Sequence, residues 1–198
     1  MSDALSVAAT TSPITLADAK RHLNVSSTAD DTLIQDYVNG AAVMLETRGS
    51  RAFIDQTRVL KMQTFSDSRY MRNRKITLPR SPLSSVTSIT YIDSAGTTQT
   101  LSSTSYRTSL ADEPGRIAEA YNNTWPATQN IQDDVTVTYV AGHSSASSGV
   151  SDPAKQAVRM VVGHWYRNRE SVTVGTINNE IAMGVDALME GEQIEGYA

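Results

Sequence analysis

Apolar residues recur with a helical period near both ends of the chain and with a strand period between them. Residues 16–23 and 30–48 place their apolar side chains three and four positions apart, which is typical of amphipathic helices. Thr15 and Asp18 have the spacing of a capping box at the start of the first helix, and Gly49 can terminate the second. The pattern therefore predicts a helical hairpin.

From residue 57 to residue 140 the pattern changes to short segments in which apolar and polar residues alternate. Such segments, separated by turns such as Asp93 to Gly96, predict a small antiparallel sandwich or barrel. A Ser/Gly-rich stretch from Gly142 to Gly149 then predicts a linker. The expected strands cover residues 58–65, 76–78, 86–92, 98–101, 106–110, 116–120 and 135–140.

A third helical pattern begins at Asp152, which we expect to cap the helix, with Pro153 at its first position. The basic residues that end near Arg169 suit the negative end of the helix dipole. We expect this helix to pack back on the hairpin, so that the ends of the chain form one layer and the middle forms another. Residues 181–189 are compatible with two further helical turns.

The sequence thus predicts an α+β fold: a helical layer made by the hairpin and the returning helix, an inserted small antiparallel β-sandwich or barrel, and an extended C-terminal tail. The expected divisions are a flexible N-terminus (1–13), the hairpin (14–56), the β domain (57–142), a linker (143–151), the C-terminal helix (152–170) and an acidic tail (171–198).

Composition excludes several classes of protein. The chain has 198 residues, of which 39% are hydrophobic and 19% are charged, as in ordinary soluble domains. It has no cysteine, which excludes disulfides and thiolate metal sites. The first 13 residues lack the pattern of a signal peptide, and the apolar patch at residues 160–163 is too short to cross a bilayer. We therefore expect a protein that is intracellular when synthesised and has no membrane partner.

Charge is distributed unevenly along the chain. Residues 170–198 contain six acidic residues and no Lys or Arg, whereas the net charge of the whole chain is -4. The first 169 residues therefore carry +2, which argues against a dedicated nucleic-acid-binding module. One basic cluster, in an expected loop between strands, is a candidate contact with DNA or with a partner: Arg69, Arg72, Arg74 and Lys75.

No combination of residues predicts catalysis. The three histidines, His22, His143 and His164, lack metal-ligand spacing, and neither a nucleophile elbow nor a phosphate-binding glycine loop is present. We therefore predict no enzymatic activity, no cofactor and no metal. A hydrolase that uses His143 beside Ser144 and Ser145 is a weaker alternative.

Several short motifs occur in a definite order and spacing along the chain. They are Ile14 to Lys20, Asp30 to Ile34, Leu78 to Pro82, Ser85 to Asp93 with Gly96, Tyr106, Gly115 to Ile117, Trp125-Pro126, Val135 to Gly142, and Asp152-Pro153 with His164 to Glu170. In their order and spacing, these motifs resemble the head–tail connector (adaptor) family of tailed phages. The resemblance covers about residues 14–188 and departs from the family pattern at His143 and at Ala182-Met183.

The resemblance implies a structural adaptor in the neck of a phage or phage-like particle, assembled in the cytoplasm of the bacterial host. It implies a ring, usually of twelve subunits, between the portal protein and a stopper or tail-completion protein, through which double-stranded DNA passes without sequence-specific contact. We expect the ring interface at Tyr37, Val38, Trp165, Tyr166, Arg167 and Arg169. The C-terminal segment would bind the portal through Ile181, Met183, Val185, Leu188, Met189, Glu190 and Glu192.

Two alternatives assign the same features differently. The chain would be another neck component, such as a stopper or tail terminator, or a nucleic-acid-binding module that uses the loop from Arg69 to Lys75. The helices that enclose the β region argue against the first alternative, because stoppers and terminators are typically smaller β proteins. Salt-sensitive binding of the isolated chain to DNA would favour the second.

Overall fold

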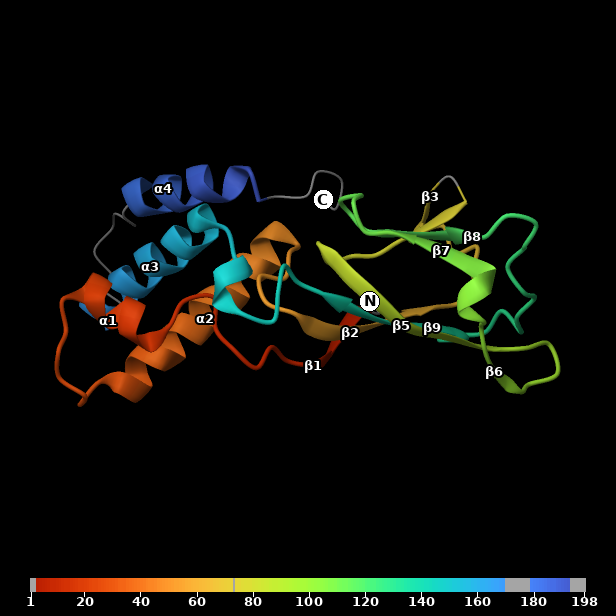
Figure 1. The fold of residues 1–198 in the computed structure, drawn as a ribbon, viewed down its shortest axis with the longest axis horizontal. Helices are drawn as coiled ribbons and strands as arrows, with labels where there is room; N and C mark the ends of the chain where they lie inside the picture. Colours follow the sequence, from red (N-terminus) through yellow and green to blue (C-terminus); the bar gives the residue numbers. More distant parts are fainter. Residues whose placement is uncertain (1–2, 73, 170–178, 193–198) are drawn as a thin grey trace. The chain divides into compact units, whose positions relative to one another are not determined.

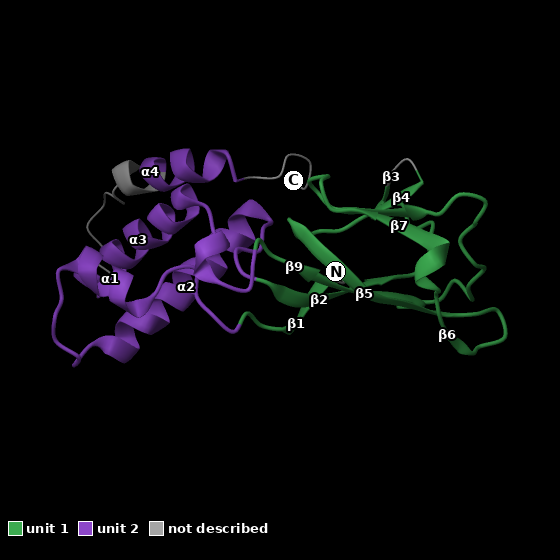
Figure 2. Ribbon diagram, viewed as in Figure 1, with its two compact units in different colours: residues 1–9, 55–143, 197 green, residues 10–54, 144–196, 198 purple. Residues whose placement is uncertain are grey.

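The chain folds into two compact units, each with its own buried core (Figures 1 and 2). The computed structural model describes residues 3–72, 74–169 and 179–192, without the side chains of residues 72 and 179–182. The β unit comprises residues 1–9 and 55–143, and the helical unit comprises residues 10–54 and 144–196.

The β unit is a sandwich of two antiparallel sheets, as its labelled strands show in Figure 1. One sheet has the strand order β1-β2-β9-β5-β6 and the other has the order β3-β4-β8-β7. Both sheets have open edges, so the predicted sandwich is confirmed and a closed barrel is not formed. The strands are β1 Asp3–Val7, β2 Gln56–Met62, β3 Met71–Arg72, β4 Lys75–Thr77, β5 Leu83–Ile92, β6 Thr98–Thr100, β7 Tyr106–Ser109, β8 Arg116–Glu119 and β9 Val135–Ala141.

The core of the β unit comes from the alternation of buried and half-buried positions along its strands. In β9 every second residue is buried, and Val137 and Tyr139 are fully enclosed. Ile76 of β4 and Ile117 of β8, which are register partners, are enclosed in the same way. Burial of each such side chain stabilises the fold by about 1.5–3 kcal/mol. The two-residue period in the sequence was therefore a reliable sign of strands.

Strand β1 lies in the segment that was expected to be a flexible N-terminus. It pairs with β2, and the carboxylate of Asp3 accepts hydrogen bonds from the guanidinium of Arg58 at 2.9 Å and the hydroxyl of Tyr139 at 2.8 Å. Burial and the neighbouring Asp3 charge raise the pKa of Tyr139 far above its usual range, so its hydroxyl stays a donor. Both partners of Asp3 are distant in sequence, which explains why the local pattern did not predict the strand.

The helical unit contains α1 (Leu16–Leu23), α2 (Asp31–Gly49), α3 (Asp152–Arg167) and α4 (Asn179–Glu190). Helices α1 and α2 form the predicted hairpin, α3 packs against both of them, and α4 packs against α3 (Figure 1). The returning helix and the α+β class are thus confirmed. In the described part of the chain, no helix combines the length and apolar character that a membrane span requires.

Two of the helix starts follow the expected cap chemistry, with one shift. The hydroxyl of Thr15 accepts a hydrogen bond from the Asp18 N–H at 3.1 Å and donates to its carboxylate at 2.7 Å, which confirms the capping box. At α3 the cap is Ser151 and not Asp152, because the Ser151 hydroxyl accepts from the Ala154 N–H at 3.3 Å. Asp152 is therefore the first helical residue, where its negative charge interacts favourably with the positive end of the helix dipole.

The end of α2 also differs by one residue from the prediction. Gly49 is the last helical residue, and Ser50 adopts the left-handed conformation (φ 52°) that terminates the helix. A Cβ at Gly49 would lie 3.3 Å from the Met189 methyl group and 3.5 Å from the Glu192 carbonyl oxygen. The glycine is thus required less for its backbone freedom than for the close approach of the end of α4 and of the residues that follow it.

Candidate subunit and partner interfaces

The aromatic and apolar residues that were expected at a ring interface pack mainly within their own helical unit. Val38 is completely buried in the core. The half-buried rings of Tyr37 and Trp165 meet edge to face, with centroids 6.0 Å apart and planes at 65°. Trp165 also covers Gly40, where a Cβ would lie 3.3 Å from its ring. The sequence led us to expect these residues at a subunit interface, whereas they form contacts between α2 and α3.

A polar cluster joins the end of α3 to the start of α2. The carboxylate of Asp30 accepts hydrogen bonds from the Tyr166 hydroxyl at 2.7 Å and the Arg169 guanidinium at 2.8 Å. The Arg169 guanidinium also lies 4.6 Å from the centroid of the Tyr166 ring. Both hydrogen bonds lower the pKa of Asp30, and the bond to Asp30 raises the pKa of Tyr166. Arg167, by contrast, is exposed and faces a cavity.

That cavity, of about 390 Å³, lies between α1 and α3. His22 of α1 lines it together with His164 and Arg167 of α3, which are distant from His22 in sequence. Burial, followed by the charges of Arg159 and Arg167, lowers the pKa of His22, so its imidazole is neutral at neutral pH. The sequence pattern did not predict this cavity. Gly163 is the residue that could have indicated it, because a glycine inside a helix allows another side chain to approach closely. A Cβ at this position would lie 3.3 Å from the His22 ring nitrogen Nε2.

Helix α4 contains most of the residues that were expected to bind the portal, and the structure divides them between two faces. Val185 and Met189 are buried against the rest of the helical unit, with exposed fractions of 3% and 0%. Met183 is 69% exposed, and Glu190 is also exposed. Leu188 is half-buried, whereas the side chain of Ile181 lies outside the described residues.

Glu192, which follows α4, is held in a buried polar contact. Its carboxylate lies 3.6 Å from Nε of Arg51, and the same nitrogen donates a hydrogen bond to the Glu192 carbonyl oxygen. The Ser151 hydroxyl, which caps α3, donates to the Glu192 carboxylate. The side chains of Arg51 and Glu192 are only 8% and 11% exposed. Together with an ion pair between Arg48 and Asp186, these contacts fix α4 at its C-terminal end.

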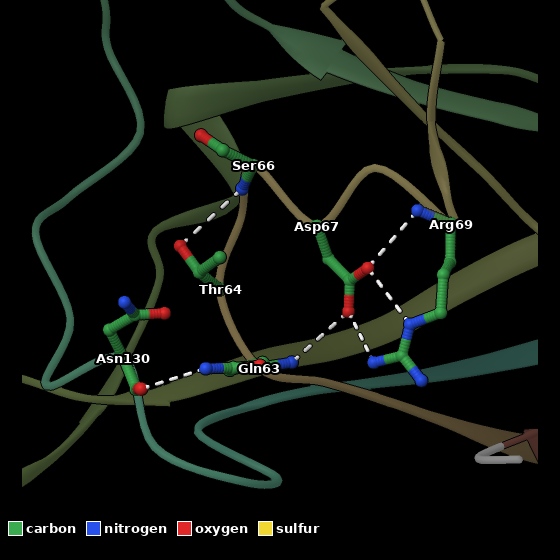
Figure 3. Close-up of polar contacts among 6 residues, drawn as sticks. All are labelled: Gln63, Thr64, Ser66, Asp67, Arg69 and Asn130. Atoms are coloured by element: carbon green, nitrogen blue, oxygen red, sulfur yellow. Dashed lines mark hydrogen bonds and ion pairs between the residues drawn. The ribbon is translucent and has the colours of Figure 1, made fainter.

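The basic cluster from Arg69 to Lys75 is partly neutralised by acids of the β unit. Two nitrogens of the Arg69 guanidinium donate to the carboxylate of Asp67, at 3.0 and 2.6 Å, and the Arg69 backbone N–H donates at 3.1 Å (Figure 3). Arg74 pairs with Glu119 at 2.9 Å. Lys75 is exposed, and the side chain of Arg72 lies outside the described residues. The contacts with Asp67 and Glu119 reduce the positive field expected of a nucleic-acid site.

Among the described residues, no group of three or more histidine, aspartate and glutamate side chains is placed to hold a metal ion. The residues that gather in the helical unit form helix–helix contacts and the cavity lined by His22 and Arg167.

The sequence matches a family described as Phage gp6-like head-tail connector protein, over residues 13–113. The chain belongs to this family. It is therefore a structural head–tail connector, an adaptor of the neck that joins head and tail. No curated protein matches the sequence significantly.

The fold of the connector is also found in solved particles. Similar chains occur in the neck of an empty gene transfer agent particle computed with C6 symmetry (TM-score 0.79), the virion of a native gene transfer agent particle (0.78) and the neck of a native particle computed with C12 symmetry (0.76). In each case the identity is 21%, and the match covers 100% of this chain and 98% of the other. The likeness thus extends over both units, including α4.

Proposed function

We propose that this connector forms a ring of twelve subunits between the portal and a stopper or tail-completion protein of its particle. Double-stranded DNA would pass through the ring without sequence-specific contact, and assembly would take place in the host cytoplasm. The observation that carries the proposal is the family membership, supported by a fold shared along its whole length with chains of necks computed with C6 and C12 symmetry. Twelve subunits are compatible with both symmetries.

A closed ring requires two different complementary faces on each subunit. The helical unit has exposed apolar side chains on α2, where Val43 and Met44 are 62% and 40% exposed. We therefore place one side of the subunit contact on the outer surface of α2. The residues expected from the sequence, such as Val38 and Trp165, support this surface from within.

The portal contact is assigned to the exposed face of α4. Val185, Met189 and Glu192 hold the helix in place, which leaves Met183, Glu190 and part of Leu188 for a partner. Glu190 forms no ion pair with any residue that the structure describes, so a basic surface on the portal would complement it.

The test uses binding of the full-length chain to purified portal. Deletion of α4 would also uncover the surface of α3 that packs against it, where Met160 meets Gly184, and is therefore a poor test. The double variant Met183→Asp with Glu190→Lys changes only exposed positions. We expect it to weaken portal binding at least about tenfold, since a new charge and a reversed charge both oppose the contact.

The matched control is Tyr121→Asp, which places a charge at an 83% exposed position of the β unit and should bind the portal like the unmodified chain. Circular dichroism should show the same helix content for all three proteins. Full-strength binding by the double variant would refute the assignment to α4.

A further inference from the structure

The sandwich of the β unit is open along one side, where β5 and β7 leave a groove of about 500 Å³. Ser84, Ser85 and Val86 line it from β5, and Tyr106, Arg107 and Thr108 line it from β7. The groove is therefore bounded by segments of two strands that belong to different sheets.

Strand β7 is the last strand of its sheet, so one side of its backbone has no neighbouring strand. The register determines which groups are free. Ala120 N–H donates to the Ser105 carbonyl at 3.0 Å, and hydrogen-bonded pairs alternate along an antiparallel ladder, so Arg107 and Ser109 bond to β8. The backbone N–H and C=O groups of Tyr106 and Thr108 consequently point away from β8, towards the open edge.

The first part of β5 is open as well. Strand β6 pairs with β5 only from Thr90 to Ile92, so residues 83–88 have a neighbouring strand, β9, on one side alone. Two irregularities in the pairing, between Leu83 and Ser85 and between Val86 and Ser88, bend this part of the strand. Natural sheets commonly cover or charge such edges, because an unpaired edge is a template for another strand.

The side chains that line the groove favour an occupant that carries a negative charge. Arg107 is exposed and forms no ion pair with any residue that the structure describes, and the groove is lined by no acidic side chain. Leu110 lies at the same groove and is 50% exposed. An occupant would gain hydrogen bonds from the backbone edge, an ion pair from Arg107 and apolar contact from Leu110.

We propose that this groove binds an extended segment of another neck protein, which adds to β7 as a further strand and presents a carboxylate side chain to Arg107. Strand addition supplies affinity through the main chain and specificity through the side chains beside it. The inference depends on neither the ring nor the portal contact, because both of those are placed on the helical unit.

The experiment is a titration of the full-length, isotope-labelled chain followed by amide chemical shifts. The probes are the end-blocked peptides TVSVEVSVT and TVSVKVSVT, which differ in one charge. We expect the glutamate peptide to shift the amides of residues 84–86 and 106–110 and to bind about two- to fivefold more tightly than the lysine peptide, as for an exposed ion pair. Arg107→Glu should reverse this preference.

A second variant separates strand addition from simple charge attraction. Thr108→Pro removes an outward N–H without removing a bond to β8, and should weaken binding of the glutamate peptide roughly fivefold. Thr108→Val keeps that N–H and should bind like the unmodified chain. The two variants should have the same spectrum elsewhere in the β unit.

Three results would overturn the proposal. One is the absence of shifts at the groove with either peptide. Another is equal binding by Thr108→Pro and Thr108→Val, which would exclude a main-chain contact. The last is binding that appears only after removal of residues 193–198, which would identify the occupant as the chain's own end. None of these results bears on portal binding, so a failure here is distinguishable from a failure of the proposed function.

Discussion

The basic loop of the β unit and the segment around Glu192 in the helical unit both contain arginine–carboxylate pairs, but the pairs differ in their exposure to solvent. Arg74 of the loop is 80% exposed where it meets Glu119, whereas Arg51 and Glu192 are 8% and 11% exposed. An exposed pair contributes little, because water and salt screen it. In a buried pair, loss of one partner leaves an uncompensated charge. The Arg74–Glu119 pair is therefore a tolerant surface contact, whereas the Arg51–Glu192 pair is a specific anchor.

The largest expected effect is that of Glu192→Ala. The change removes the carboxylate beside the buried Arg51 guanidinium and the acceptor of the Ser151 hydroxyl. We expect the free energy of unfolding of the helical unit to fall by about 3 kcal/mol, because a buried ionic contact and a buried hydrogen-bond acceptor are lost together. Chemical denaturation followed by the fluorescence of Trp165 measures it, with Trp125→Phe in both proteins so that the β unit does not contribute.

Glu190→Ala is the matched control for this change. It removes an acid two residues earlier, at an exposed position, and should alter the free energy of unfolding by less than about 0.5 kcal/mol. Equal effects of the two substitutions would mean that Glu192 is no anchor, and that the contrast between the two regions is wrong.

An intermediate effect is expected within the basic loop itself. Asp67 is only 7% exposed and accepts three hydrogen bonds from Arg69, which lower the pKa of its carboxyl group. Asp67→Ala should therefore destabilise the β unit by about 1–3 kcal/mol. Arg74→Ala should cost less than about 0.5 kcal/mol, because that guanidinium is exposed. Thermal unfolding of both variants compares them directly, and a larger loss for Arg74→Ala would contradict the account.

The smallest effect concerns pH and the cavity of the helical unit. Because the pKa of His22 is lowered in the folded state, the unfolded chain binds a proton more readily. Its contribution to stability is complete above the ordinary value of 6.5 and is lost as the pH falls from 6.5 through the folded pKa. His22→Gln should flatten the dependence of the unfolding free energy on pH in this range. The expected change in slope is small, because His22 is only partly buried and solvent screens its interactions. An unaltered slope would contradict the prediction.

Periodic elements were predictable from the sequence, and elements held by distant partners were not. The stripe of α2 and the alternation of β9 appear within a few residues, so local pattern was sufficient for both. Strand β1 is held by Arg58 and Tyr139, which no window around Asp3 includes. The shift of the α3 cap from Asp152 to Ser151 has a similar origin, because both residue types cap helices well.

The candidate surfaces were predictable only in part, for a related reason. An apolar stripe indicates that a helix face is covered, but does not say whether another helix or another subunit covers it. Val38 and Met189 were assigned to partners and are instead covered by the chain itself. The charge of the basic loop was visible in the sequence, whereas its neutralisation by Glu119 depends on a strand 45 residues away. The groove beside β7 had no sequence signal, since it is formed by unpaired backbone.

We have proposed that this connector assembles as a closed ring on the portal. Native mass spectrometry of purified portal with an excess of the full-length chain measures the composition of that assembly. We expect one complex that contains twelve copies of the connector, and we expect Met183→Asp and Glu190→Lys together to abolish it. A mixture of partly occupied portals without a preferred stoichiometry, or an open-ended series of larger assemblies, would contradict the proposal.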